Sequence, residues 1–211
     1  MRHRRLLSCL AVGAVAAGST VALAPVAAAD AHGTTSLAEV LLADGSGFDD
    51  NWNDFDIVTQ AVLAVIGNAG EEGTPVAALT QGEVALTAFL PTDRAFRALA
   101  QDVTGTKLNS EEAVFAAVAS LGLPMVETVL LNHVTTFGTV DSRTALGADG
   151  LGLPMVGGGT VEVDVRRPNA RQTYLVDGAA GNRDAHLSPS HLDINLGNKQ
   201  IAHGISEVLL P

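Results

Sequence analysis

The chain has 211 residues, with 23 acidic residues against 12 lysines and arginines, and its formal net charge is −11. Such a surface repels phosphate backbones and anionic lipid heads, which argues against nucleic acid as a partner. The only cysteine, Cys9, lies in the apolar leader described next. The remaining residues therefore have no disulfide, thiolate metal site or catalytic cysteine.

Residues 1–29 are predicted to be a secretory signal peptide. A basic start precedes an uncharged apolar run over 6–23, and small residues follow it. We place cleavage after Ala29, with a cut after Ala24 as the alternative. The run is about long enough to span a bilayer, but its alanine- and glycine-rich composition and the cleavage motif favour removal. Cys9 lies near the start of the run instead of after it, which argues against a lipoprotein.

The predicted mature protein is one secreted domain that does not insert into a membrane. Cleavage leaves 182 of the 211 residues and removes three arginines, which takes the net charge from −11 to −14. That length can bury roughly 70% of the unfolded surface in one core. Scarce lysine with abundant alanine, glycine and valine suggests a bacterial source with GC-rich DNA.

The first half of the chain is predicted to be mainly helical. After a short lead over 30–35, Ser36 and Glu39 form a capping box. Apolar residues then recur at three- and four-residue steps, with proline or polar caps at several starts. The expected helices cover 37–42, 55–66, 75–79, 111–120 and 124–131, and one more begins at 93 after an N-cap at Thr92. One strand is expected over 84–90.

The second half is predicted to contain strands. Valines alternate with polar residues over 161–165, which is typical of a half-buried strand. Further strands are expected over 173–176, 191–196 and 200–210, with loops at 138–159 and 177–189. Helices followed by strands predict an α+β fold. The hexamer LGLPMV occurs twice, at 121–126 and 151–156, but in different contexts, so we do not interpret it as a repeat.

Three segments in order resemble the fasciclin domain: LTAFLPTDRAF at 86–96, LLNHV at 130–134 and IAHGISEVLLP at 201–211. The resemblance covers 36–211. It implies a fasciclin-type fold in which two β-sheets pack as a wedge with several helices alongside. The segment around 141–190 is longer than in the usual domain, so we treat it as a loop-rich insertion.

The resemblance also implies roles for individual residues. Binding in animal members of the family involves the second segment, which here is Asn132, His133 and Val134, with Asn132 in place of the family's tyrosine. Ser206 replaces an aspartate in the third segment. The other motif residues are expected to be structural, as buried anchors or chain turns. They are Phe89, Pro91, Thr92, Phe96, His203, Leu209 and Leu210.

The sequence contains neither an HExxH zinc motif nor a GxSxG nucleophile elbow. A triad of Asp193, His203 and Ser206 is unfavourable, because an odd separation on one strand points His203 and Ser206 to opposite faces. We therefore predict a protein without catalytic residues or cofactors. The expected function is cell adhesion, or the binding of an extracellular protein or cell-surface polymer. The alternative is an extracellular carrier of a small ligand.

Two groups of polar residues are candidates for metal sites. The calcium candidates are Asp49, Asn51, Asn53 and Asp56, whose oxygens suit that ion. They do not match an EF-hand loop, so we favour a solvated loop in which Asn53 or Asp54 caps the next helix. His186 and His191, near Asp184 and Asp193, match no zinc or copper template. The prediction is that no metal is bound, with weak calcium binding by the first group as the alternative.

Overall fold

The computed structural model describes residues 32–45, 47–49 and 51–211. The predicted signal peptide, with both cleavage positions, lies outside the described residues. Residues His32–Pro211 form one compact unit. This unit contains helices and two sheets, with strand orders β2-β1-β7 and β3-β4-β5-β6, which confirms the α+β prediction.

The expected helices form close to their expected positions, and polar side chains cap the starts of three of them. Ser36 makes the capping box with Glu39, Thr74 precedes Pro75, and Ser110 accepts from the Ala113 N–H. The α-helices are α1 (Leu37–Asp44), α2 (Asp56–Asn68), α3 (Asp93–Thr104), α4 (Glu111–Ala119), α5 (Leu123–Leu131) and α6 (Ser142–Ala145). Short 3₁₀ turns lie at η1 (Gly70–Glu72), η2 (Pro75–Thr80) and η3 (Ala170–Gln172).

Among the described residues no single helix has the length and apolar composition needed to cross a membrane. Only α4 and α5 taken together meet those two criteria, and they are bent by 101° at the break between them.

The strands are β1 (Leu86–Pro91), β2 (Val134–Thr135), β3 (Leu151–Pro154), β4 (Thr160–Val165), β5 (Thr173–Val176), β6 (Ala185–His186) and β7 (Gln200–Ile205). The expectation of a strand over 191–196 is wrong. Asp193 and Asn195 have φ angles of 57° and 67°, which interrupt an extended chain, and only an isolated bridge joins Ile194 to Ala202. The expected strand over 200–210 ends at Ile205.

The segment 141–190 contains more regular structure than its glycine content predicts. It holds α6 and all four strands of the second sheet, so the loops expected over 138–159 and 177–189 are partly wrong. The prediction for β4 is confirmed, since Val161 and Val163 are buried while Glu162 is exposed.

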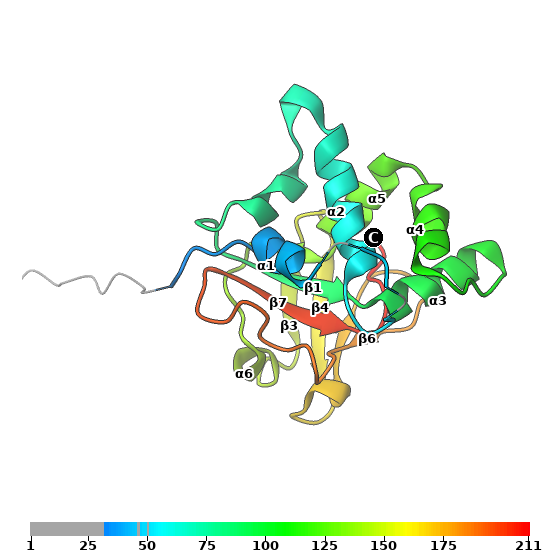
Figure 1. Cartoon of the computed structure of the whole chain (residues 1–211). Coiled ribbons are helices and arrows are strands. Elements are labelled where there is room, and N and C mark those ends of the chain that lie inside the picture. The colour runs from blue at the N-terminus through cyan, green and yellow to red at the C-terminus, as the bar shows by residue number, and fades with distance from the viewer. Residues whose placement is uncertain (1–31, 46, 50) are drawn as a thin grey trace, which may run out of the picture. The chain divides into compact units, whose positions relative to one another are not determined.

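The β2-β1-β7 sheet lies between two apolar cores. Leu86, Ala88 and Leu90 of β1 pack into the core formed with the helices, whereas Phe89 packs into the core formed with the second sheet. Alternation along an extended strand sends successive side chains to opposite faces, so β1 contributes to both cores. Figure 1 shows α2, α4 and α5 on one side of β1 and β7, with β3 and β4 on the other.

Gln200, at the start of β7, connects this sheet to the N-terminal helices. Its side chain is fully buried. The amide oxygen accepts from the Leu37 N–H at 2.8 Å, and the amide nitrogen donates to the carbonyls of Ala78 and Gln81 at 2.8 and 2.9 Å. One side chain therefore satisfies three backbone groups from two separate segments.

The substitution Gln200→Leu should lower the free energy of unfolding by about 2–4 kcal/mol, because it leaves buried backbone groups without partners. Chemical denaturation measures the change. Gln101→Leu, at an exposed position of α3, is the matched control and should change stability by less than about 0.5 kcal/mol. Equal losses in the two variants would contradict this role for Gln200.

Candidate functional site

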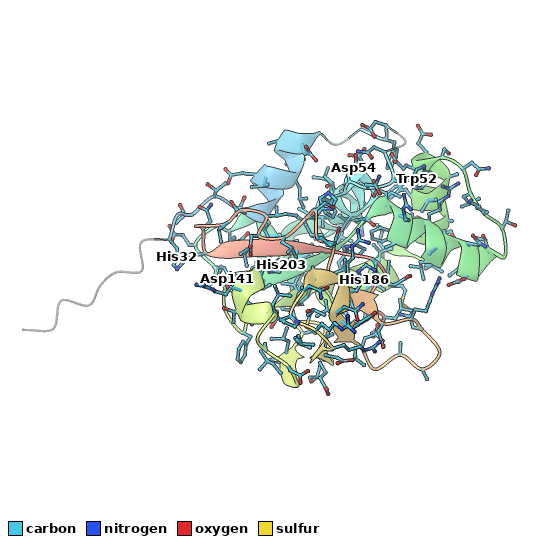
Figure 2. All side chains as sticks on the ribbon, turned by 90° about the horizontal axis from the view of Figure 1, so that it is seen from below. His32, Trp52, Asp54, Asp141, His186 and His203 are labelled. Carbon is cyan, nitrogen blue, oxygen red and sulfur yellow. The ribbon has the colours of Figure 1, made fainter. Side chains whose placement is uncertain are left out.

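Carboxylates converge where the loop over 49–54 meets the first turns of three helices. They are Asp49 and Asp54 of the loop, Asp56 of α2, Asp93 of α3 and Glu111 of α4. Asp56, Asp93 and Glu111 are 8%, 0% and 0% exposed. Asp54 and the neighbouring Trp52 are labelled in Figure 2. We call these five residues the acidic cluster.

Asp93 caps helix α2 from a different helix. Its carboxylate oxygens accept from the backbone N–H groups of Asp56 at 3.2 Å and Ile57 at 2.9 Å. The expectation that Asn53 or Asp54 caps α2 is therefore wrong. The loop is held against α3 in return, because the carbonyl oxygens of Asp54 and Trp52 accept from the N–H groups of Asp93 and Arg94. These hydrogen bonds hold the loop and the starts of α2 and α3 together.

The surroundings of Asp56 and Asp93 disfavour the ionised form of their carboxyl groups. Burial, and then the nearby negative charges of Asp54 and Glu111, raise the pKa of Asp56 to about 6. Burial also raises the pKa of Asp93, and a hydrogen bond to Asp54 adds to the shift because the two carboxyls share a proton. The cluster thus retains protons that ordinary aspartates release.

The structure brings together two of the four calcium candidates. One carboxylate oxygen from each of Asp49, Asp54 and Asp56 lies within 4.8 Å of the others, and so does one from each of Asp54, Asp93 and Glu111. The Oδ1 of Asn51 accepts from the Asn53 N–H, and that of Asn53 accepts from Arg94. The sequence pattern missed Asp54, Asp93 and Glu111 as cluster members.

A polar cleft of about 330 Å³ lies next to the acidic cluster, and the same loop contributes residues to both. Asp and Glu are absent from its described lining, although the protein as a whole is acidic. Its lining is Asn53, Thr92, Arg94, Arg171, His186, Ser188, Pro189, Ser190, His191, Ile205 and Ser206. Arg94 and Arg171 are exposed, and neither forms an ion pair with a described carboxylate. We call this feature the basic cleft.

The loop over 188–191 is held onto β7 at Gly204. The Gly204 N–H donates to the His191 carbonyl and its carbonyl accepts from the Ser188 N–H, both at 2.7 Å. A Cβ on Gly204 would lie 2.6 Å from the Cβ of His191, so a larger residue would push the loop away. His191 also meets Phe55 edge-on, with ring centroids 5.1 Å apart. The wall of the cleft is thereby fixed to the central sheet.

His191 lies within hydrogen-bonding distance of two serines but lacks the setting of a catalytic base. Its Nδ1 is 3.1 Å from the hydroxyls of Ser188 and Ser190. Within the described part of the chain, no carboxylate hydrogen-bonds to the ring to orient it, as a triad requires. His203 is also unsuited, because it accepts from the Asp193 N–H and faces the Val140 carbonyl.

Asn132, His133 and Val134 are buried, at 3%, 4% and 6% exposure. His133 connects α5 to the C-terminal segment. Its Nδ1 lies 2.7 Å from the Val129 carbonyl, and its Nε2 accepts from the Leu209 N–H at 2.9 Å. The turn at Gly157 covers Asn132, since a Cβ there would lie 3.1 Å from the Asn132 nitrogen. Binding through these three residues stays a prediction.

The motif residues assigned structural roles lie mostly inside the domain. Phe89 and Phe96 occupy the two different cores, at 2% exposure each. Thr92 stands at the N-cap position of α3, although its side chain makes no capping bond. Pro91, His203 and Leu209 are buried, and Leu210 is half-buried.

Comparison with known proteins relates this chain to one fold. No family model matches it, and no curated protein does. Among solved structures, it is similar to a FAS1 domain pair from the insect cell adhesion molecule fasciclin I, with a TM-score of 0.54 and 14% sequence identity. The match covers 84% of this chain and 51% of the other, so the chain spans about half the length of that relative. The chain therefore has a fasciclin-like fold.

His133 makes stability depend on pH. Burial lowers its pKa from 6.5 to about 4, so the unfolded chain binds a proton on this residue at a pH where the folded chain does not. The stabilisation is present above about pH 6.5 and is lost as the pH falls toward 4. His133→Leu should cost about 2–4 kcal/mol at pH 7, because the Val129 carbonyl and Leu209 N–H lose their partner.

Denaturation of the parent and the variant at several pH values measures this effect. The stability difference between them should shrink as the pH falls from 7 to 4. His32→Leu, at an exposed position, should show no such trend. A difference that is constant over this range would mean that the pKa of His133 is not lowered in the folded state.

Proposed function

We propose that this chain is a secreted, non-enzymatic binding module, with a fasciclin-type domain over 36–211, that attaches to a cell-surface or matrix polymer through acidic groups on that polymer. The basic cleft carries the proposal. Two arginines that form no ion pair with a described carboxylate and two histidines line it, in a protein whose formal net charge is −11. Guanidinium groups bind carboxylates and phosphates through paired hydrogen bonds.

The fold supports a role in attachment, because the similar FAS1 domain pair comes from a cell adhesion molecule. Fold alone does not determine function, so the partner is inferred from the chemistry of the cleft. The acidic surroundings favour acidic groups spaced along a polymer over a continuous polyanion such as nucleic acid. An extracellular protein partner with an exposed carboxylate is the alternative outcome.

The small-ligand carrier has less support. The two wholly apolar cavities found among the described residues have volumes of about 20 Å³ each. That is room for about one water molecule, whereas drug-sized ligands occupy roughly 300–1,000 Å³. The larger hollows, including the basic cleft, open to solvent and are partly polar.

The test measures binding of the purified protein to isolated wall or matrix polymer, before and after the polymer's carboxyl groups are amidated and its phosphates removed. Arg171→Gln and Arg94→Gln should each weaken binding by about tenfold to a hundredfold, the effect of one charge-assisted hydrogen bond. Arg143→Gln, an exposed change of the same charge on α6, is the matched control and should bind as the parent does.

Binding that survives both chemical treatments of the polymer would overturn the assignment of acidic groups. Equal losses in all three variants would show that general charge, not the cleft, is responsible. No polymer binding, together with saturable and Arg171-dependent binding to one extracellular protein, would replace the polymer by a protein partner.

A further inference from the structure

Asp56 is a buried acid without a hydrogen-bond donor. The residue is 8% exposed, and no N–H or O–H group of the described residues donates to its carboxylate. One oxygen of that carboxylate points to the oxygens of Asp49 and Asp54, within 4.8 Å of both. The Oδ1 of Asp54 is fully covered and has no hydrogen-bond partner in the described part of the chain. A buried carboxylate in this state is costly unless a positive charge compensates it.

The N-terminus of α2 already holds one acid. The N–H groups of Asp56 and Ile57 at its start donate to Asp93, so Asp93 is an acid that this N-terminus stabilises. Asp49 accepts from the Asn51 N–H. Asp49, Asp54 and Asp56 are three further carboxylates at the same place.

The three oxygens lie close enough together to share one cation. Calcium lies about 2.3–2.6 Å from each of its oxygen ligands, so two oxygens on opposite sides of it are about 4.6–5.2 Å apart. All three oxygens lie within 4.8 Å of one another, so one calcium ion can contact them together. Calcium accepts irregular sets of oxygen ligands, whereas magnesium requires near-octahedral geometry.

We propose that Asp49, Asp54 and Asp56 bind a calcium ion at the start of α2, with water molecules completing its coordination. Asp49 is exposed and gives the ion access from solvent, while Asp56 forms the inner wall. Asp93 lies behind the site. Both of its oxygens already accept backbone hydrogens, so it positions α2 and is not counted among the ligands.

The charges around the site favour a cation. The groups that face Asp56 are Asp44 from α1, Asp49 and Asp54 from the loop, and Glu111 from α4, all of them acidic. A bound cation reduces the repulsion among these carboxylates.

Terbium luminescence tests the site directly, because terbium replaces calcium and is excited by a nearby indole. Trp52 is the only tryptophan and lies two residues from Asp54, so the two Cα atoms are at most about 7 Å apart. We expect saturable emission on adding terbium to the purified protein and its loss on adding calcium chloride. Magnesium chloride should compete at least tenfold more weakly.

Thermal unfolding in chelator and in calcium chloride provides the second measurement. Calcium at ~100 times its Kd should raise the Tm by about 5–10 °C. Asp54→Asn and Asp56→Asn should each abolish that rise, yet melt above the parent in chelator at pH 8, because an amide removes one of the crowded charges. Asp102→Asn, the same change at an exposed position of α3, should respond to calcium as the parent does.

A variant that melts above the parent in chelator has an intact fold. If it also fails to respond to calcium, it has lost a ligand of the ion. The proposal is overturned if the parent shows neither terbium emission nor a calcium-dependent Tm, or if both cluster variants keep the parent's response. It is also overturned if Asp102→Asn loses the response equally. Because the metal alone is the probe, these outcomes are independent of whether the basic cleft binds a polymer.

Discussion

Strand β1 is hydrogen-bonded to β7 in parallel and is buried along its whole length. A sheet that is apolar on both faces needs a covering layer on each side, and here the helices supply one layer and the β3-β4-β5-β6 sheet the other. The pairing joins residues more than a hundred positions apart, such as Leu86 and Gln200. The relative placement of the helices, the loops and the C-terminal segment follows from this buried layer.

The buried layer also explains why charged residues gather at one edge. Strand β1 leads directly into α3, so Asp93 lies at the point where the strand leaves the core. Helices α2 and α4 pack on the same layer with their first turns nearby, and each brings an acid in that turn. Each of these acids is favourable for its own helix. When the helices pack, these carboxylates come close together and repel one another, which does not happen in any one helix alone.

The acidic cluster and the basic cleft share their supporting residues. Asn53 and Asp54 are adjacent in the loop, and so are Asp93 and Arg94 in α3, yet within each pair one residue belongs to the cleft and the other to the cluster. Backbone hydrogen bonds connect the loop to α3 at both Trp52 and Asp54. The loop and the start of α3 therefore contribute neighbouring residues to both features.

The sequence by itself determined the local structure. The capping box at Ser36, the apolar period of α2 and the valine alternation in β4 are each set by neighbouring residues, and these patterns predicted elements that form. The α+β class followed from their order. Three motifs also led to a fasciclin-like fold, which the structural comparison supports.

Only the tertiary structure decided the sites. The cap of α2 comes from Asp93, 37 residues away, and local rules could not choose it over Asn53 or Asp54. The basic cleft combines Arg94, Arg171 and His191 from separate segments, and no spacing along the chain predicts that they meet. Positive φ angles at Asp193 and Asn195 ended an apparent strand because tertiary contacts outweigh local preference. Short-range patterns fix elements, whereas charge and burial at a site depend on how distant elements pack.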